Sequence, residues 1–179
     1  MPGPLWRSLL DGAADHIDVL VFAGLFLPDG YPEVAKLLAA KAEQRVKIRL
    51  ALGDPDSDTV RRRGEEEQIG EGMAAWIRLG LMYLQDAISA SGVELRFHAT
   101  TLYNSIYRFD DDMLVNAHVY GAPAAHSPVL HLRRLPGGRL VDHYQASFER
   151  VWDQANGDNL PRALMLGERR SYGSDRLLQ

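Results

Sequence analysis

The stretch Ile17–Gly24, with the sequence IDVLVFAG, is a nearly continuous run of apolar residues. A short run of this kind is typical of a β-strand that is buried on both of its faces. Such a strand lies inside a sheet that other elements cover on both sides, because each face must be kept from water. The run therefore predicts an α/β domain built around this strand.

The rest of the chain predicts helices and strands that complete such a domain. The predicted helices cover residues 4–15, 32–44, 60–90 and 139–155, with a weak point in the third around Gly70 and Gly72. The predicted strands cover residues 17–24, 46–52, 93–99, 102–109, 113–117 and 129–134. This order predicts a mixed sheet flanked by helices in three layers. We expect one domain over residues 1–155, followed by a loosely ordered tail over residues 156–179.

The composition and charge exclude several classes of protein. The chain has 179 residues, of which 46% are apolar, and this suits one globular domain. Its net charge is −4, whereas a domain that binds DNA through the phosphates usually carries a basic face. The one basic cluster, Arg61–Arg63, is followed four residues later by Glu65–Glu67, which favours paired charges on a solvated helix face. Direct DNA binding by this chain is therefore disfavoured.

The chain also lacks cysteine and any long apolar run. The missing cysteines exclude disulfides, thiolate catalysis and cysteine-based zinc sites. A membrane-spanning helix needs about 18 or more consecutive apolar residues, and no such run occurs. The first residues, Met1–Pro4, do not begin a signal peptide pattern. We expect a cytoplasmic protein that does not enter a membrane.

Residues Tyr103–Tyr120 read YNSIYRFDDDMLVNAHVY, which is an alternating strand, an acidic turn and a second strand. This segment resembles the active-site motif of the phospholipase D superfamily, H-x-K-x4-D followed by a turn, a strand and G-S-x-N. The match needs no gap. Asp110 falls on the Asp of the motif, Ala117 and His118 fall on Gly-Ser, and Tyr120 falls on the closing Asn.

The flanks of the motif also look like one phospholipase D half-unit, and the resemblance covers roughly residues 5–155. However, Tyr103 stands at the position of the motif's His, and Ser105 stands at the position of its Lys. In active members the His attacks phosphorus and the Lys neutralises charge on the phosphoryl oxygens. A phenol with a pKa of about 10 is a poor nucleophile, and serine carries no charge. The resemblance thus implies the fold without its catalytic His and Lys.

The positions that the motif uses for catalysis still carry side chains that suit the binding of a small molecule. Alternate residues of a strand share a face, so Tyr103 and Ser105 are expected to point the same way. His118 and Tyr120 are expected to face the same cavity, whereas Asp110 favours a cap of the turn over a ligand contact. The alternative for each residue is an ordinary core or loop role. The candidate ligand-binding residues are Asp54, Tyr103, Ser105, Asp110, His118 and Tyr120.

Metal and cofactor motifs are weak in this sequence. Asp54, Asp56 and Asp58 have the spacing of a calcium loop, but Thr59 stands where that loop needs glycine. Asp54 is better placed as a ligand contact, because it follows the second strand at an edge where α/β sheets bind ligands. The histidines have no metal-binding spacing and no glycine-rich phosphate loop occurs, so we expect no metal and no cofactor. A zinc site assembled only by folding is the alternative.

Three functions remain open at this stage. The chain resembles the C-terminal sensor domains that follow helix-turn-helix (XRE-type) regions in some actinobacterial transcription regulators. That resemblance implies a non-catalytic, effector-binding domain, with DNA bound only by a separate helix-turn-helix module. The resemblance to a single phospholipase D half-unit implies a homodimer that pairs across the motif. The alternative is a divergent phosphodiesterase or nuclease that uses His118. A third possibility is a purely structural dimerisation module.

Overall fold

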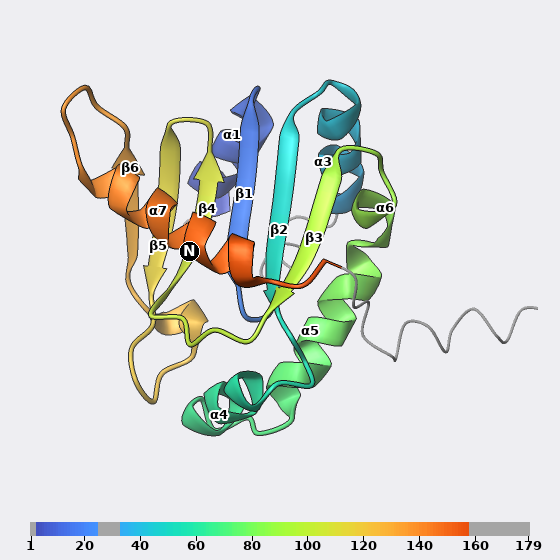
Figure 1. The fold of residues 1–179 in the computed structure, drawn as a ribbon, viewed down its shortest axis with the longest axis vertical. Helices are drawn as coiled ribbons and strands as arrows, with labels where there is room; N and C mark the ends of the chain where they lie inside the picture. The colour runs from blue at the N-terminus through green and yellow to red at the C-terminus, as the bar shows by residue number, and fades with distance from the viewer. Residues whose placement is uncertain (1–2, 25–32, 158–179) are drawn as a thin grey trace, which may run out of the picture.

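Figure 1 shows the computed structural model, which describes residues 3–24 and 33–157. Its centre is a six-stranded sheet in the order β3-β2-β1-β4-β5-β6. The strands are β1 (His16–Val21), β2 (Lys47–Gly53), β3 (Val93–His98), β4 (Asn104–Phe109), β5 (Asp112–Ala117) and β6 (Val129–Arg133). β1, β2 and β3 run parallel, whereas β4, β5 and β6 form antiparallel pairs. The predicted mixed sheet is confirmed.

Helices cover both faces of this sheet. They are α1 (Gly3–Gly12), α3 (Val34–Glu43), α4 (Asp58–Glu66), α5 (Gly72–Tyr83), α6 (Gln85–Ile88) and α7 (Leu140–Gln154), with a 3-10 helix η1 (Ala124–His126). In Figure 1, α7 crosses the front of the sheet, and α1 and α3 lie behind it. The three predicted layers are therefore present. Within the described residues, none of the helices is both long enough and apolar enough to cross a membrane.

The prediction of one helix over residues 60–90 is wrong, because the chain bends twice there. The weak point near Gly70 is a full break between α4 and α5, and a second bend at Leu84 separates α5 from α6. A Cβ atom on Gly64 would lie 2.0 Å from the carbonyl oxygen of Gly70, so the turn closes against α4 only because Gly64 lacks one. Gly70 itself has a φ of 52°, which glycine adopts without strain. The corner carries α4 beyond the ends of the strands (Figure 1).

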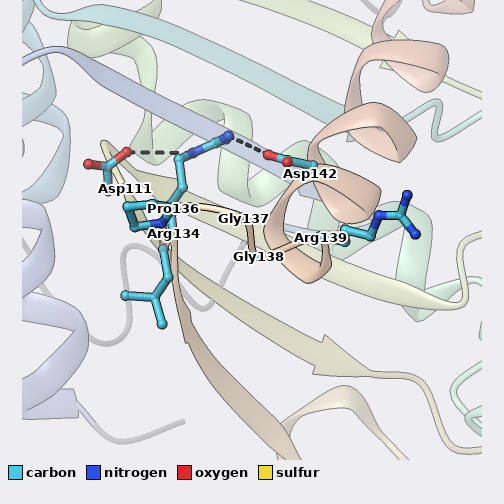
Figure 2. Close-up of a pocket in the computed structure, with 8 residues that line it drawn as sticks. Asp111, Arg134, Pro136, Gly137, Gly138, Arg139 and Asp142 are labelled. Carbon is cyan, nitrogen blue, oxygen red and sulfur yellow. Dashed lines mark hydrogen bonds and ion pairs between the residues drawn. The ribbon is translucent and has the colours of Figure 1, made fainter.

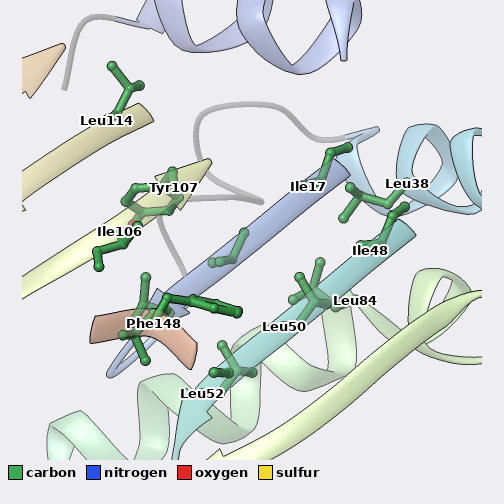
Figure 3. Close-up of a cluster of buried hydrophobic side chains, with 14 of the residues drawn as sticks. Ile17, Leu38, Ile48, Leu50, Leu52, Leu84, Ile106, Tyr107, Leu114 and Phe148 are labelled. Atoms are coloured by element: carbon green, nitrogen blue, oxygen red, sulfur yellow. The ribbon is translucent and has the colours of Figure 1, made fainter. Parts of the chain in front are cut away.

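The apolar runs of the sequence form the core of the domain. Ile17 of β1 and Leu50 and Leu52 of β2 are completely buried. Figure 3 shows these side chains in one cluster with Leu38 of α3 and Phe148 of α7. Burial of a side chain of this size stabilises a fold by about 1.5–3 kcal/mol relative to exposure. The central strands are therefore held mainly by apolar contacts with the helices.

One buried carboxylate interrupts this core. Asp18, in the middle of β1, is only 1% exposed. Arg49 of β2 donates two hydrogen bonds to it, at 2.7 and 3.0 Å, and two more to Glu149 of α7, at 2.8 and 2.9 Å. Arg108 of β4 donates a further bond to Asp18, at 3.1 Å. Hydrogen bonds from Arg49 also hold the pKa of Glu149 below its usual value. This Asp18 cluster (Asp18, Arg49, Arg108 and Glu149) attaches α7 to the sheet.

Two predicted segments fall partly outside the described residues. The helix predicted from residue 32 is described from Val34, and the tail predicted over residues 156–179 is described only to Gly157. Within that tail, Asn156 forms two backbone hydrogen bonds with Phe97, each 2.9 Å long. The described start of the tail is thus attached to the sheet.

We predict that Arg49→Ala lowers the free energy of unfolding by about 3–5 kcal/mol, because it leaves the buried Asp18 carboxylate under-paired. Urea denaturation measures this change. Arg61→Ala is the matched control, since Arg61 forms an exposed pair with Asp58 at 2.8 Å. Such exposed pairs contribute at most about 1 kcal/mol. Equal, small losses in both variants would contradict the role given to the Asp18 cluster.

Candidate functional site

A cavity of about 540 Å³ lies at the carboxyl end of β1. Ser105 and Tyr107 of β4 and Asn116 of β5 form its base. They alternate along the strands with residues such as Arg108, which points towards α7, so the cavity is on the opposite face of the sheet. Its walls are mostly apolar and come from α5, the end of β1 and the segment around η1. The largest wall side chains are Phe22, Met73, Trp76, Leu79 and Tyr83.

Ser105 and His118, two of the predicted site residues, meet at this cavity. The Ser105 Oγ lies 3.0 Å from His118 Nε2, and His118 Nδ1 lies 3.2 Å from the carbonyl oxygen of Leu102. A carbonyl oxygen only accepts hydrogen bonds, so Nδ1 carries the proton of the neutral ring and Nε2 is bare. Ser105 therefore donates its hydroxyl proton to His118.

The surroundings of His118 keep its ring neutral. Burial lowers the pKa of His118 to about 4, and the positive charge of nearby Arg63 contributes to the lowering. The ring also stacks on Phe22, with 5.8 Å between the ring centroids. At neutral pH the cavity thus holds an uncharged serine–histidine pair.

Arg63 is a buried cation close to this pair. It donates to Glu67 at 2.6 Å, to Glu66 at 3.2 Å and to the carbonyl oxygen of Ala122 at 3.3 Å. The prediction that Arg61–Arg63 form a solvated helix face is therefore wrong for Arg63. The reason is that α4 packs against the loop after β5, which covers this side chain. Its charge is directed at the two glutamates, not into the cavity.

Asn116 is a site residue that the sequence reasoning missed. It is 5% exposed, and its Nδ2 donates to the carbonyl oxygens of Ser127 and Pro128, both at 3.2 Å. These bonds hold the loop after η1 against β5. A signal was present, because an amide inside the apolar strand of residues 113–117 needs a specific partner. Phe22 and Trp76 carried no such signal, since a cavity wall and a core have the same apolar composition.

Asp110 has a structural role in this fold. Its carboxylate accepts hydrogen bonds from the backbone N–H groups of Ala14, Asp15 and His16, at 2.8, 2.8 and 2.7 Å. Partial burial alone would raise the pKa of Asp110, but these three donors hold it below its usual value. The residue adopts a φ of 53° in the turn between β4 and β5. It joins that turn to the start of β1, away from the cavity.

The remaining candidates do not converge on the cavity. Tyr103 and Tyr120 are 81% and 85% exposed, so the prediction that they point inward with Ser105 and His118 is wrong. The reason is that β4 begins at Asn104 and β5 ends before His118, and alternation holds only within a strand. The Asp54 carboxylate accepts the N–H of its neighbour Asp56 at 3.0 Å and does not line the cavity. Among the described residues, no three metal-binding side chains gather closely enough to hold an ion.

A second hollow, of about 570 Å³, lies at the turn between β6 and α7 (Figure 2). Arg134 forms ion pairs there with Asp111, at 3.5 Å, and with Asp142. Gly137 adopts a φ of 78° and lets the turn close. The carboxylates of Asp111 and Asp142 are exposed and both pair with Arg134, and none of the predicted site residues reaches this hollow. We therefore place the candidate site at the cavity beside Ser105.

The chain resembles known proteins in its structure. No protein-family profile matches the sequence, and no curated protein sequence matches it. The chain is similar to the solved structure of Nuc, a phospholipase D family member from Salmonella typhimurium. The TM-score is 0.50 and the identity 15%, over 86% of this chain and 88% of that chain. The fold is phospholipase D-like.

A phospholipase D-like fold is thus the part of the sequence resemblance that is confirmed. A further similar structure is that of TrmBL2, an archaeal chromatin protein that shows a novel mode of DNA binding. In that comparison the TM-score is 0.49 and the identity 14%, over 86% of this chain. This chain spans about half of that protein, 49% of its length. At these identities the likeness concerns the fold alone.

We predict that His118 makes the stability of the domain fall as the pH falls from about 6.5 to about 4. The pKa of His118 is about 4 in the fold and 6.5 ordinarily, so between these values the unfolded chain binds more protons. Urea denaturation across this range should show wild type losing stability relative to His118→Phe. His126→Phe is the control, because His126 is exposed, and it should keep the wild-type slope. Parallel curves for wild type and His118→Phe would mean that the His118 pKa is ordinary.

Proposed function

We propose that this chain is a non-catalytic, ligand-binding domain that serves a transcription regulator. The observation that carries the proposal is the cavity at the phospholipase D-like motif, whose serine–histidine pair is neutral and satisfied within an apolar wall. A concave, mostly apolar cavity with a few oriented polar groups is the usual form of a small-molecule site. At about 540 Å³, it has the size of such sites.

The same geometry supports the proposed absence of phosphodiester cleavage. Cleavage of a phosphodiester needs a nucleophile or base that is active at neutral pH and a cation for the phosphoryl oxygens. A histidine with a pKa of about 4 is a weak base at neutral pH. Arg63, the cation that acts on His118, is already paired with Glu66 and Glu67. These features favour ligand binding over the alternative function, a nuclease that uses His118.

The regulatory setting rests on the sequence resemblance to effector domains. The chain carries a net charge of −4, which does not favour contact with DNA phosphates. In this proposal, a separate helix-turn-helix module binds the DNA. The present domain supplies the response to a small molecule.

We predict that the domain binds the neutral fluorescent probe N-phenyl-1-naphthylamine and does not hydrolyse bis(p-nitrophenyl) phosphate. Fluorescence titration measures the first, and release of p-nitrophenol measures the second. Ala124→Trp should abolish probe binding, because Ala124 lines the cavity. Ala75→Trp, at an exposed position of α5 that does not line the cavity, should leave binding unchanged. Turnover that disappears in His118→Ala would overturn the proposal in favour of the nuclease.

The proposal includes a homodimer in which Tyr103 and Tyr120 lie at the interface. Both rings flank the motif and are more than four-fifths exposed, at 81% and 85%. Aromatic residues are enriched in protein interfaces and costly to leave in water. A second copy of the chain, related by two-fold symmetry, would cover both rings at once.

We predict a dimer by light scattering after gel filtration, and a monomer for the double variant Tyr103→Arg, Tyr120→Arg. Leu130→Arg is the control, since Leu130 is an exposed apolar residue on the edge strand β6, outside the motif segment of residues 103–120. It should leave the mass unchanged. A wild-type chain that stays monomeric at high concentration would rule out the dimer without affecting the ligand-binding proposal.

A further inference from the structure

The hydrogen-bond donors of Ser105, His118 and Asn116 at the cavity are already used within the protein. Ser105 donates its only hydroxyl proton to His118 Nε2, at 3.0 Å. His118 donates its only ring proton to the carbonyl oxygen of Leu102, at 3.2 Å. Neither side chain therefore has a proton left for a ligand.

The amide protons of Asn116 are also used within the protein. Its amide nitrogen has two protons, and two carbonyl oxygens, those of Ser127 and Pro128, each lie 3.2 Å from it. The reverse orientation of the amide would point its oxygen at both carbonyl oxygens, so these contacts fix which atom is nitrogen. The Asn116 Oδ1 makes no hydrogen bond to another described residue and is an acceptor.

Glu67, which also lines the cavity, has only acceptor atoms as a carboxylate. Its partner Arg63 is not among the lining residues, and the protons of its two terminal nitrogens face Glu66, Glu67 and Ala122. Ser105, Asn116 and Glu67 therefore leave only acceptors at the cavity: the lone pairs of Ser105 Oγ, of Asn116 Oδ1 and of the Glu67 carboxylate. The hydroxyl and indole donors of Tyr83 and Trp76 belong to the rim, where these side chains are 54% and 41% exposed.

We propose that the cavity selects a neutral, mostly apolar molecule that carries a hydroxyl or N–H donor, as a phenol or an alcohol does, and directs that donor at Ser105 and Asn116. This inference rests on the proposed ligand-binding function and names the class of ligand. A phosphate or carboxylate group would find acceptors at the base and the negative charge of Glu67 beside them. A cation would find the carboxylate of Glu67 already paired with Arg63, at 2.6 Å, and would stay an unpaired charge in a mostly apolar cavity. A neutral donor meets neither penalty.

The test uses two isomers, 4-ethylphenol and 4-methylanisole, which contain the same atoms but differ in the hydroxyl proton. Phenyl phosphate serves as the anionic probe. Each is titrated against the domain loaded with N-phenyl-1-naphthylamine, and its displacement of that fluorophore gives the affinity. One hydrogen bond of about 1.4 kcal/mol corresponds to about tenfold in affinity, so 4-ethylphenol should bind about tenfold more tightly than its isomer. Phenyl phosphate should displace least.

The variant His118→Phe tests whether the hydrogen bond from Ser105 to His118 sets this preference. The phenyl ring can keep the stacking on Phe22, but it offers no acceptor, so the Ser105 hydroxyl proton becomes available to the ligand. The preference for 4-ethylphenol should shrink at least several-fold as 4-methylanisole, an acceptor, gains affinity. Tyr103→Phe is the matched control, since it alters an exposed ring outside the cavity and should keep the tenfold preference.

Equal affinities for the two isomers in the wild type, or tightest binding of phenyl phosphate, would overturn this inference and leave the ligand-binding function intact. An unchanged preference in His118→Phe would also overturn it, because the serine–histidine bond would then not set the polarity of the site. If neither the fluorophore nor any of the three probes binds, the proposed function itself fails. The outcomes thus separate the class of ligand from the existence of the site.

Discussion

The buried carboxylate of Asp18, in the middle of the central strand β1, determines how several neighbouring charged side chains are arranged. A buried charge is tolerated only when it is paired and hydrogen-bonded, and here Arg49 and Arg108 approach it from the two neighbouring strands. Arg49 then binds Glu149, which attaches α7 to this face of the sheet. A slip of one residue in either strand pair would turn a cation to the wrong face, so the cluster also favours the observed register.

The two faces of the sheet therefore differ in polarity. The face towards α7 holds paired charges, whereas the opposite face holds an apolar cavity with a neutral serine–histidine pair. Asp110 lies in the turn between β4 and β5, away from the cavity, and accepts hydrogen bonds from three backbone N–H groups at the start of β1. Asp110, which the sequence resemblance places on the acid of the phospholipase D motif, therefore stabilises the arrangement of the strands.

The hairpin explains which site residues were predictable from the sequence. Ser105 and His118 belong to one antiparallel hairpin, where a local turn brings the two strands together, and their meeting followed from the motif. Tyr103 and Tyr120 lie just beyond the strand ends, where alternation no longer fixes the direction of a side chain. Arg63 was misjudged because its helix has the charge pattern of an exposed face, while the loop at Ala122 covers it.

The sequence by itself determined the order of the strands along the chain, a weak point near Gly70 and the presence of Tyr103 and Ser105 where the resemblance expects His and Lys. These features are local, since they follow from apolar periodicity, glycine and residue type. Only the tertiary structure decided that α5 forms one wall of a cavity over Ser105 and His118, that His118 is neutral with its proton on Nδ1, and that the donors of Ser105, His118 and Asn116 are used. The burial and the pKa of a side chain, and the partners of its hydrogen-bond donors, depend on groups far apart in the chain. No local pattern indicates which of these groups meet.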